Sequence, residues 1–245
     1  MALRSFADGA LFAEVLGDGS PRILALHGWA RRGSDFKPSL SGLPALALDL
    51  PGFGVSPPPT WAIGAAGYAD IISGILPEFD GPLVLIGHSF GGRVAICLAA
   101  RNPGQVSGVL LTGTPLVRLR PPAPPSMSYR LMRRLNKLGL LSDSRLEEER
   151  RRRGSLDYRS ATGVMRDILV TVVNESYEDE LVAATMPLVL LWGGEDSEVP
   201  VTVAERALVL RGDLPTALEV VPGIGHHLPT QAPDDLRRVA TRMLR

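Results

Sequence analysis

Short apolar runs recur along the chain and alternate with segments of helical character. The runs are nearly continuous rather than alternating, which is typical of strands buried on both faces of a parallel sheet. They lie at residues 23–26, 45–48, 83–86, 109–111, 188–192 and 218–221. Helical segments lie at residues 68–76, 93–101, 201–210 and 233–244. This order predicts an α/β fold with a mostly parallel, doubly wound sheet.

Two regions depart from this alternation. Residues 6–16 predict an antiparallel hairpin at the leading edge of the sheet. Residues 116–186 contain the run Pro121-Pro122-Ala123-Pro124-Pro125, which cannot continue a helix or a central strand, and then become helical and heavily charged. We therefore predict a core formed by residues 1–115 and 187–245, with an inserted helical cap at residues 116–186.

The sequence Gly87-His88-Ser89-Phe90-Gly91 stands between the apolar run 83–86 and the helical segment 93–101. A strand, Gly-x-Ser-x-Gly and a helix in that order indicate a sharp turn that holds a serine hydroxyl clear of the sheet. Side chains at the two glycines would crowd the turn. A chance serine in a glycine-rich loop, or a phosphate-binding turn, are the alternatives, although no Lys-Ser or Lys-Thr pair follows the glycines. Ser89 is the candidate nucleophile.

A nucleophilic serine needs a base, and the base needs an orienting acid. Asp196 follows the apolar run 188–192 and so belongs to a loop at the carboxyl edge of the sheet, where open α/β sheets build their sites. His226 directly follows a Gly-x-Gly turn after the last predicted strand. We predict Asp196 as the acid and His226, rather than its neighbour His227, as the base. The other two histidines, His27 and His88, are expected to fix loop backbones through hydrogen bonds.

The oxyanion formed on attack needs backbone donors that are fixed in place. Phe90 follows the nucleophile at the start of a helix, where N–H groups lack intrahelical partners. The turn His27-Gly28-Trp29 follows the apolar run 23–26 and presents the Trp29 amide. Trp29 and Phe90 are therefore the predicted oxyanion donors. The Trp29 indole is either a wall of the substrate pocket or ordinary packing.

Five blocks of the chain resemble the α/β-hydrolase superfamily in its usual order. The blocks are His27-Gly28-Trp29, Asp49-Leu50-Pro51-Gly52-Phe53-Gly54, Gly87-His88-Ser89-Phe90-Gly91-Gly92, Trp192-Gly193-Gly194-Glu195-Asp196 and Gly225-His226. The chain order Ser, Asp, His is also the order of that fold. The first two blocks are most similar to the pimeloyl-[acyl-carrier protein] methyl ester esterase group and small carboxylesterases. Gln231 departs from a glutamate that many relatives carry five residues after the base.

The resemblance implies a serine hydrolase that cleaves a carboxylic ester through an acyl-enzyme intermediate, on a small or a carrier-bound substrate. Thioester, lactone or C–C bond hydrolysis and cofactor-free perhydrolysis use the same framework and stay open. A binding protein on a hydrolase scaffold is the alternative that is not an enzyme. Because this chemistry needs only side chains and water, we expect no cofactor. No metal is expected either, since two of the four histidines are adjacent and no His-x-x-x-His spacing occurs.

Composition narrows the range of partners and cellular locations expected for the protein. The 26 basic and 26 acidic side chains cancel, so no nucleic-acid partner is expected. Cys97 is the single cysteine and is expected to be a small buried apolar side chain. The N-terminal residues lack the long apolar core of a secretory signal, and no stretch of about 18 apolar residues occurs. We expect a cytoplasmic protein without a membrane partner.

Charge is uneven within the predicted cap. Residues 116–153 carry eleven basic and four acidic side chains, a net charge of +7. Two interpretations are open. The basic residues form a solvated face with internal ion pairs, or they form a docking surface for an acidic partner or an anionic substrate. The family resemblance implies an acyl carrier protein as that partner.

Overall fold

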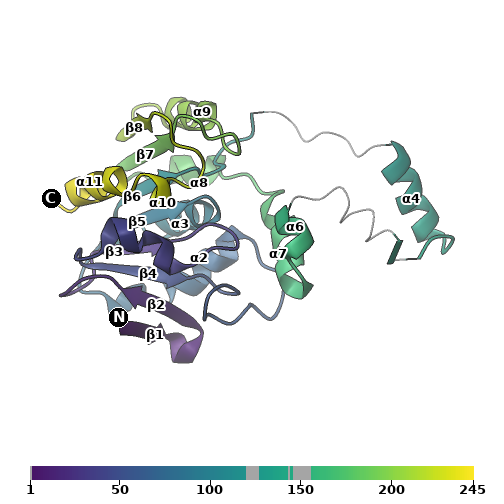
Figure 1. Cartoon of the computed structure of the whole chain (residues 1–245), viewed down its shortest axis with the longest axis horizontal. Coiled ribbons are helices and arrows are strands. Elements are labelled where there is room, and N and C mark those ends of the chain that lie inside the picture. The colour runs from purple at the N-terminus through teal and green to yellow at the C-terminus, as the bar shows by residue number, and fades with distance from the viewer. Residues whose placement is uncertain (1, 120–126, 143, 146–155) are drawn as a thin grey trace.

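The computed structural model describes residues 2–119, 127–142, 144–145 and 156–245. Within them, one eight-stranded sheet has the order β1-β2-β4-β3-β5-β6-β7-β8 (Figure 1). The strands β1 and β2 are antiparallel to their neighbours, and all other pairs are parallel. The bounds are β1 Ala2–Phe6, β2 Leu11–Val15, β3 Ile23–Leu26, β4 Ala45–Asp49, β5 Leu83–His88, β6 Val106–Thr112, β7 Leu188–Gly193 and β8 Thr216–Val221.

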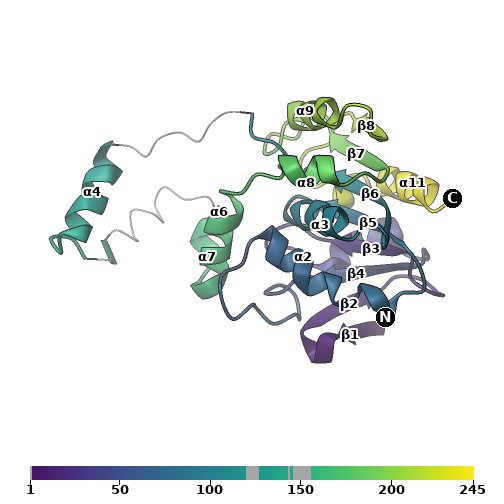
Figure 2. The ribbon, with the colours of Figure 1, turned by 180° about the vertical axis from the view of Figure 1, so that it is seen from behind.

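Helices cover both faces of the sheet (Figures 1 and 2). The α-helices are α1 Lys37–Leu40, α2 Ala65–Ser73, α3 Phe90–Arg101, α4 Met127–Lys137, α6 Leu156–Ser160, α7 Gly163–Val172, α8 Glu178–Ala183, α9 Val201–Arg211, α10 Leu228–Gln231 and α11 Pro233–Met243. Short 3-10 helices lie at Ala7–Gly9, Gly33–Phe36 and Leu76–Glu78. On one face α2, α3, α8 and α9 contribute to one apolar cluster, and on the other α1 and α11 contribute to a second.

The burial of each strand and helix matches the apolar pattern of its sequence. Every residue of β3, β5 and β7 is buried, as the continuous apolar runs predict for strands covered on both faces. Helix α3 is buried on nearly all sides because it packs between the sheet, α2 and α8. Helix α11 instead buries one stripe, formed by Leu236, Val239 and Ala240. The predicted doubly wound fold is confirmed.

The edge hairpin is also confirmed, but it begins at Ala2 rather than at residue 6. Residues of β1 before Phe6 are exposed or half-buried, so they lack the apolar pattern of an inner strand. Helix α2 begins at Ala65, three residues before the predicted start at 68. Its first turn consists of Ala65, Ala66 and Gly67, which give no apolar periodicity. Cys97 is buried, as predicted.

Between β6 and β7 the described elements are the helices α4, α6, α7 and α8. Helix α8 packs against α3 and α9, whereas Figure 1 places α4 away from the sheet. The division into a core and a cap at residues 116–186 stays a prediction. Arg120, the proline run and the cluster Arg150–Arg153 lie outside the described residues. None of the described helices is both long and apolar enough to cross a lipid bilayer.

Close approach of α3 to β3 requires a glycine at residue 91. A Cβ atom there would overlap the backbone carbonyl of Leu26. We expect Gly91→Ala to lower the free energy of unfolding by about 1–3 kcal/mol, because backbone cannot yield as a flexible side chain can. Urea unfolding would measure the change. Gly104→Ala is the matched control, since a Cβ at 104 meets no atom within 4 Å; equal stability of the two variants would contradict the prediction.

Candidate active site

Ser89 occupies the sharp turn between β5 and α3. Its backbone has φ 49° and ψ −111°, in the left-handed region that side chains other than glycine rarely adopt. The turn is held by the Ser89 N–H, which donates to the carbonyl of Thr112 at 2.9 Å, and by the Gly92 N–H, which donates to the Ser89 carbonyl at 3.1 Å. The structure therefore places Ser89 on the strained turn that the Gly-x-Ser-x-Gly motif predicts.

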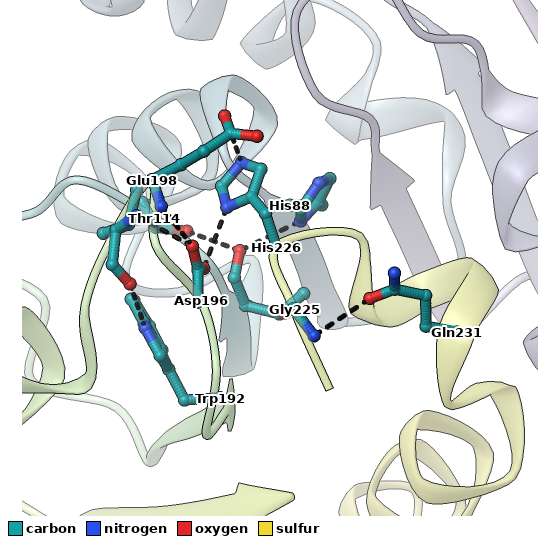
Figure 3. A network of polar contacts seen from close by, with 10 residues as sticks. His88, Thr114, Trp192, Asp196, Glu198, Gly225, His226 and Gln231 are labelled. Carbon is teal, nitrogen blue, oxygen red and sulfur yellow. Dashed lines mark hydrogen bonds and ion pairs between the residues drawn. The ribbon is translucent and has the colours of Figure 1, made fainter. Parts of the chain in front are cut away.

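Asp196 is fixed by the loop that follows β7. Its Oδ1 accepts hydrogen bonds from the backbone N–H groups of Glu198 at 3.0 Å and Val199 at 2.8 Å. The Trp192 indole N–H donates to the Val199 carbonyl at 2.8 Å and ties the loop to the strand (Figure 3). Burial alone would raise the pKa of Asp196, but the hydrogen bonds from His226, Val199 and Glu198 outweigh it and lower the pKa.

His226 and Asp196 meet although 30 residues separate them. The His226 Nδ1 lies 2.8 Å from the Asp196 Oδ2, and the Asp196 side chain is only 1% exposed (Figure 3). The Gly225 N–H just before the histidine donates to the Gln231 Oε1 at 3.1 Å. Gln231 thus supplies the acceptor oxygen that a glutamate would supply at this position. His227 is exposed and has no such bond with Asp196 within the described chain.

Gly113 creates the space for this pair, and sequence reasoning missed it. It follows β6 with φ 54°, and a Cβ there would lie 2.9 Å from the His226 ring and 3.2 Å from the Asp196 Oδ2. The only signal in the sequence is a glycine directly after a buried strand. A residue with a side chain would therefore collide with both members of the pair.

The contact expected between the nucleophile Ser89 and the base His226 is not made. Ser89 and His226 line one cavity, but no hydrogen bond joins the Ser89 hydroxyl to His226 among the described residues. The His226 Nε2 instead lies 3.7 Å from the Glu198 Oε2 (Figure 3). Glu198 is a second site residue that sequence reasoning missed. Catalytic hydrogen bonds often tighten only once a substrate is bound, so this geometry leaves Ser89 as the candidate nucleophile.

Two cavities meet at Ser89. The larger, of about 490 Å³, is lined by His226 and by the acidic residues Asp157 and Glu198, among others. The smaller, of about 100 Å³, is lined by the apolar Leu169, Val172 and Val173 and also by the charged Arg93 and Asp157. Trp29, Ser89 and Asp157 line both. The larger cavity therefore has more polar and charged lining residues than the smaller one.

The predicted oxyanion donors lie beside Ser89. The backbone N–H groups of Trp29 and Phe90 donate to no other group in the described part of the chain. The Trp29 indole packs edge-on against Phe53 and Phe90, with ring centroids 5.0 and 5.3 Å away, and also lines both cavities. The indole is thus both a pocket wall and a packing residue. The role of the two amides as oxyanion donors stays a prediction.

His27 and His88 fix backbone, as predicted. The His27 ring bonds the Gly28 carbonyl at 2.7 Å through Nδ1 and accepts from the Leu50 N–H at 3.0 Å through Nε2. The His88 Nδ1 lies 3.2 Å from the Thr112 carbonyl. Burial lowers the pKa of His27 to about 4 and that of His88 to about 3. Both rings are therefore neutral at pH 7.

Neutral burial of His27 makes stability depend on pH. The unfolded chain binds a proton near the usual pKa of 6.5, and folded His27 does so only near a pKa of 4, so acidification favours unfolding. The stability that neutral His27 contributes is fully present above pH 6.5 and is lost as the pH falls through 4. In His27→Gln, the slope of the unfolding free energy against pH should decrease in this window by up to about 1.4 kcal/mol per pH unit. Urea unfolding at several pH values would test this. The exposed His227→Gln is the control, and a His27→Gln curve parallel to the wild type would contradict the prediction.

No group of three or more metal-ligating side chains in suitable positions occurs among the residues that the structure describes. The absence of a metal and of a cofactor stays a prediction.

The alpha/beta hydrolase family model matches residues 23–239, so this chain belongs to that family. Over 98 residues it is 39% identical to Lipase LipV of Mycobacterium tuberculosis, an alignment that covers 38% of this chain and 37% of the relative. Over 101 residues it is 34% identical to a pimeloyl-[acyl-carrier protein] methyl ester esterase of Neisseria meningitidis, covering 40% of this chain and 38% of the relative. These alignments span less than half the length of the relatives.

The fold has solved counterparts. A thermophilic esterase from Thermogutta terrifontis superposes with a TM-score of 0.68 at 22% sequence identity, over 96% of this chain and 92% of that one. This likeness confirms the α/β-hydrolase fold that the motif blocks indicate. The family and the fold together define the class of protein as an alpha/beta hydrolase.

Proposed function

We propose that this protein hydrolyses carboxylic esters through an acyl-enzyme intermediate on Ser89. The observation that carries the proposal is that His226 lines the same cavity as the strained Ser89 turn and contacts the buried Asp196 at 2.8 Å. A nucleophile and a base in one cavity, with a buried acid bonded to the base, are the parts of a serine hydrolase. Relatives named lipase and methyl ester esterase support ester substrates.

In the first half-reaction the Ser89 Oγ attacks the ester carbonyl carbon while the His226 Nε2 takes the hydroxyl proton. Asp196 accepts from Nδ1, which fixes the tautomer and stabilises the imidazolium. The Trp29 and Phe90 amides donate to the tetrahedral oxyanion. The C–O bond to the alcohol then breaks, and His226 returns the proton to the departing alkoxide oxygen. The products are an acyl-Ser89 ester and a free alcohol.

The second half-reaction repeats these steps with water as the nucleophile. His226 takes a proton from water, the new hydroxyl attacks the acyl carbon, and the bond to the Ser89 Oγ breaks with return of the proton to Oγ. The carboxylic acid leaves. We assign the acyl chain to the 100 Å³ cavity, beside Leu169, Val172 and Val173, and the alcohol to the larger cavity, because His226 lines that cavity and must reach the leaving oxygen.

A panel of substrates with matched acyl groups tests the reaction class. p-Nitrophenyl esters of two to eight carbons, the corresponding thioesters and simple lactones would be compared by kcat/KM. We expect the oxygen esters to give the highest values, with an optimum at short acyl chains. Turnover of lactones or thioesters alone would replace esterase activity with one of those reactions.

We also propose that the substrate is carried by an acyl carrier protein, because α4 presents a row of cations. Arg130, Arg133, Arg134 and Lys137 are all exposed, and α4 has no acidic side chain. Acidic partners are attracted to such a surface. The similarity to a pimeloyl-[acyl-carrier protein] methyl ester esterase points to the same class of substrate. A cytoplasmic location would suit this partner.

Salt dependence separates carrier docking from hydrolysis. Surface charges are screened over about 8 Å at physiological ionic strength, so rising salt should lower kcat/KM for a carrier-bound methyl ester. The value for a small neutral ester of the same acid should change little. Equal responses of the two substrates would reject carrier docking and leave the esterase assignment in place.

A further inference from the structure

The outer nitrogen of His226 faces a carboxylate of its own. The His226 Nε2 lies 3.7 Å from the Glu198 Oε2, while Nδ1 contacts Asp196 on the other side of the ring (Figure 3). Glu198 and Asp196 belong to the same loop and are joined by the Glu198 N–H, which donates to the Asp196 Oδ1. The Asp196 side chain is 1% exposed and that of Glu198 is 63% exposed. One loop thus places a buried and an accessible carboxylate on the two ring nitrogens.

The two carboxylates face ring nitrogens that differ in when they carry a proton. Asp196 bonds an N–H that the ring carries in both its neutral and its charged form. Nε2 carries a proton only after it has taken one from Ser89 or water, and before that it presents a lone pair. A carboxylate beside Nε2 therefore gains little from the neutral ring and attracts the imidazolium.

We propose that Glu198 is a positioning residue for His226, which stabilises the imidazolium formed in each half-reaction and holds Nε2 toward the cavity. The inference rests on the proposed esterase function. Glu198 lines the same cavity as Ser89 and His226, so its carboxylate belongs to the region where the reaction is proposed to occur.

Several other charged or titratable groups lie around the His226 ring and must be separated from Glu198 in the pH profile. His88 on β5 lies 5.0 Å from the His226 ring, and burial lowers its pKa to about 3, so it stays neutral in an assay above pH 5. His227 lies 5.5 Å away in the same loop. Asp157 on α6 lines the cavity, and burial together with the charge of Glu198 raises its pKa. Asp196, bonded to Nδ1, is the other carboxylate in contact with the ring among the residues that the structure describes.

Glu198→Gln keeps the shape of the side chain and removes its charge. We expect the plateau kcat for a neutral p-nitrophenyl ester to fall about two- to fivefold, the size typical of an exposed ion pair. The acid limb of the kcat/KM profile should move to lower pH by about half a unit, because the inactive imidazolium loses a counter-charge. Both differences should shrink in high salt. Glu198→Asp should keep most of the wild-type acid limb, since the charge remains.

Two variants serve as comparisons. Glu195→Gln removes an exposed charge from the same loop without touching His226, and its profile should match the wild type. Asp157→Asn tests whether any cavity carboxylate acts alike, and we expect a smaller shift. Superimposable Glu198→Gln and wild-type profiles, or an acid limb moved to higher pH, would overturn the proposal. A wild-type protein without esterase activity would instead reject the proposed function, which separates the two failures.

Discussion

Replacing Ser89 with Ala should lower kcat for a p-nitrophenyl ester by on the order of 10⁶-fold, the loss seen when the nucleophile of a serine hydrolase is removed. The residual rate would come from the oxyanion donors and from binding alone. The expected change in KM is small, because the hydroxyl contributes little to holding the ground state. Initial rates with purified enzyme at pH 8 would measure both constants.

The control for this variant is Ser197→Ala. Ser197 is exposed on the loop of Asp196, only one residue from the acid, and should tolerate the change. Because Ser89 lies on a strained turn, the unfolding midpoint of Ser89→Ala must be measured as well. A stable Ser89→Ala protein that retained a tenth or more of the wild-type rate would move the nucleophile to another residue.

Asp196→Asn should cost on the order of 10⁴-fold in kcat while leaving the loop intact. An asparagine oxygen can still accept from the Glu198 and Val199 N–H groups, as the Asp196 Oδ1 does. Its amide nitrogen would then face the His226 Nδ1 in place of the Asp196 Oδ2. A donor there favours the tautomer with the proton on Nε2, which cannot accept the Ser89 proton.

Urea unfolding of Asp196→Asn separates this effect from a folding defect. We expect a midpoint close to that of the wild type at pH 7, together with the large loss of kcat. Asp196→Ala would remove the acceptor of both loop amides and should lower both stability and rate. A loss below about tenfold in a stable Asp196→Asn protein would show that His226 does not depend on this carboxylate.

The fold was largely predictable because hydrophobicity sets it. Continuous apolar runs locate the inner strands β3, β5 and β7, since both faces of each are covered. The first strand, β1, is an exposed edge, and its pattern carries no such information. The nucleophile turn and the acid loop were also predictable, because each stands directly after a buried strand and contains glycines that the local backbone requires.

The parts of the site that the sequence did not reveal depend on tertiary contacts. Glu198 gains its position from the turn that Asp196 closes with two backbone N–H groups, and nothing in the residue type distinguishes it from the exposed Glu195 nearby. Gly113 matters because two residues distant in sequence fill the space beside it. Asp157 reaches the cavity from α6, in the part of the chain where motifs are absent.

The central claim is that the Ser89 hydroxyl is made nucleophilic by His226. Fluorophosphonate labelling followed by peptide mass spectrometry tests it directly, because the probe forms a covalent bond only with an activated nucleophile. The account predicts one adduct, on Ser89, in the wild type, and strongly slowed labelling in His226→Ala. An unlabelled Ser89, an adduct on a different residue, or equal labelling rates with and without the His226 imidazole would contradict it.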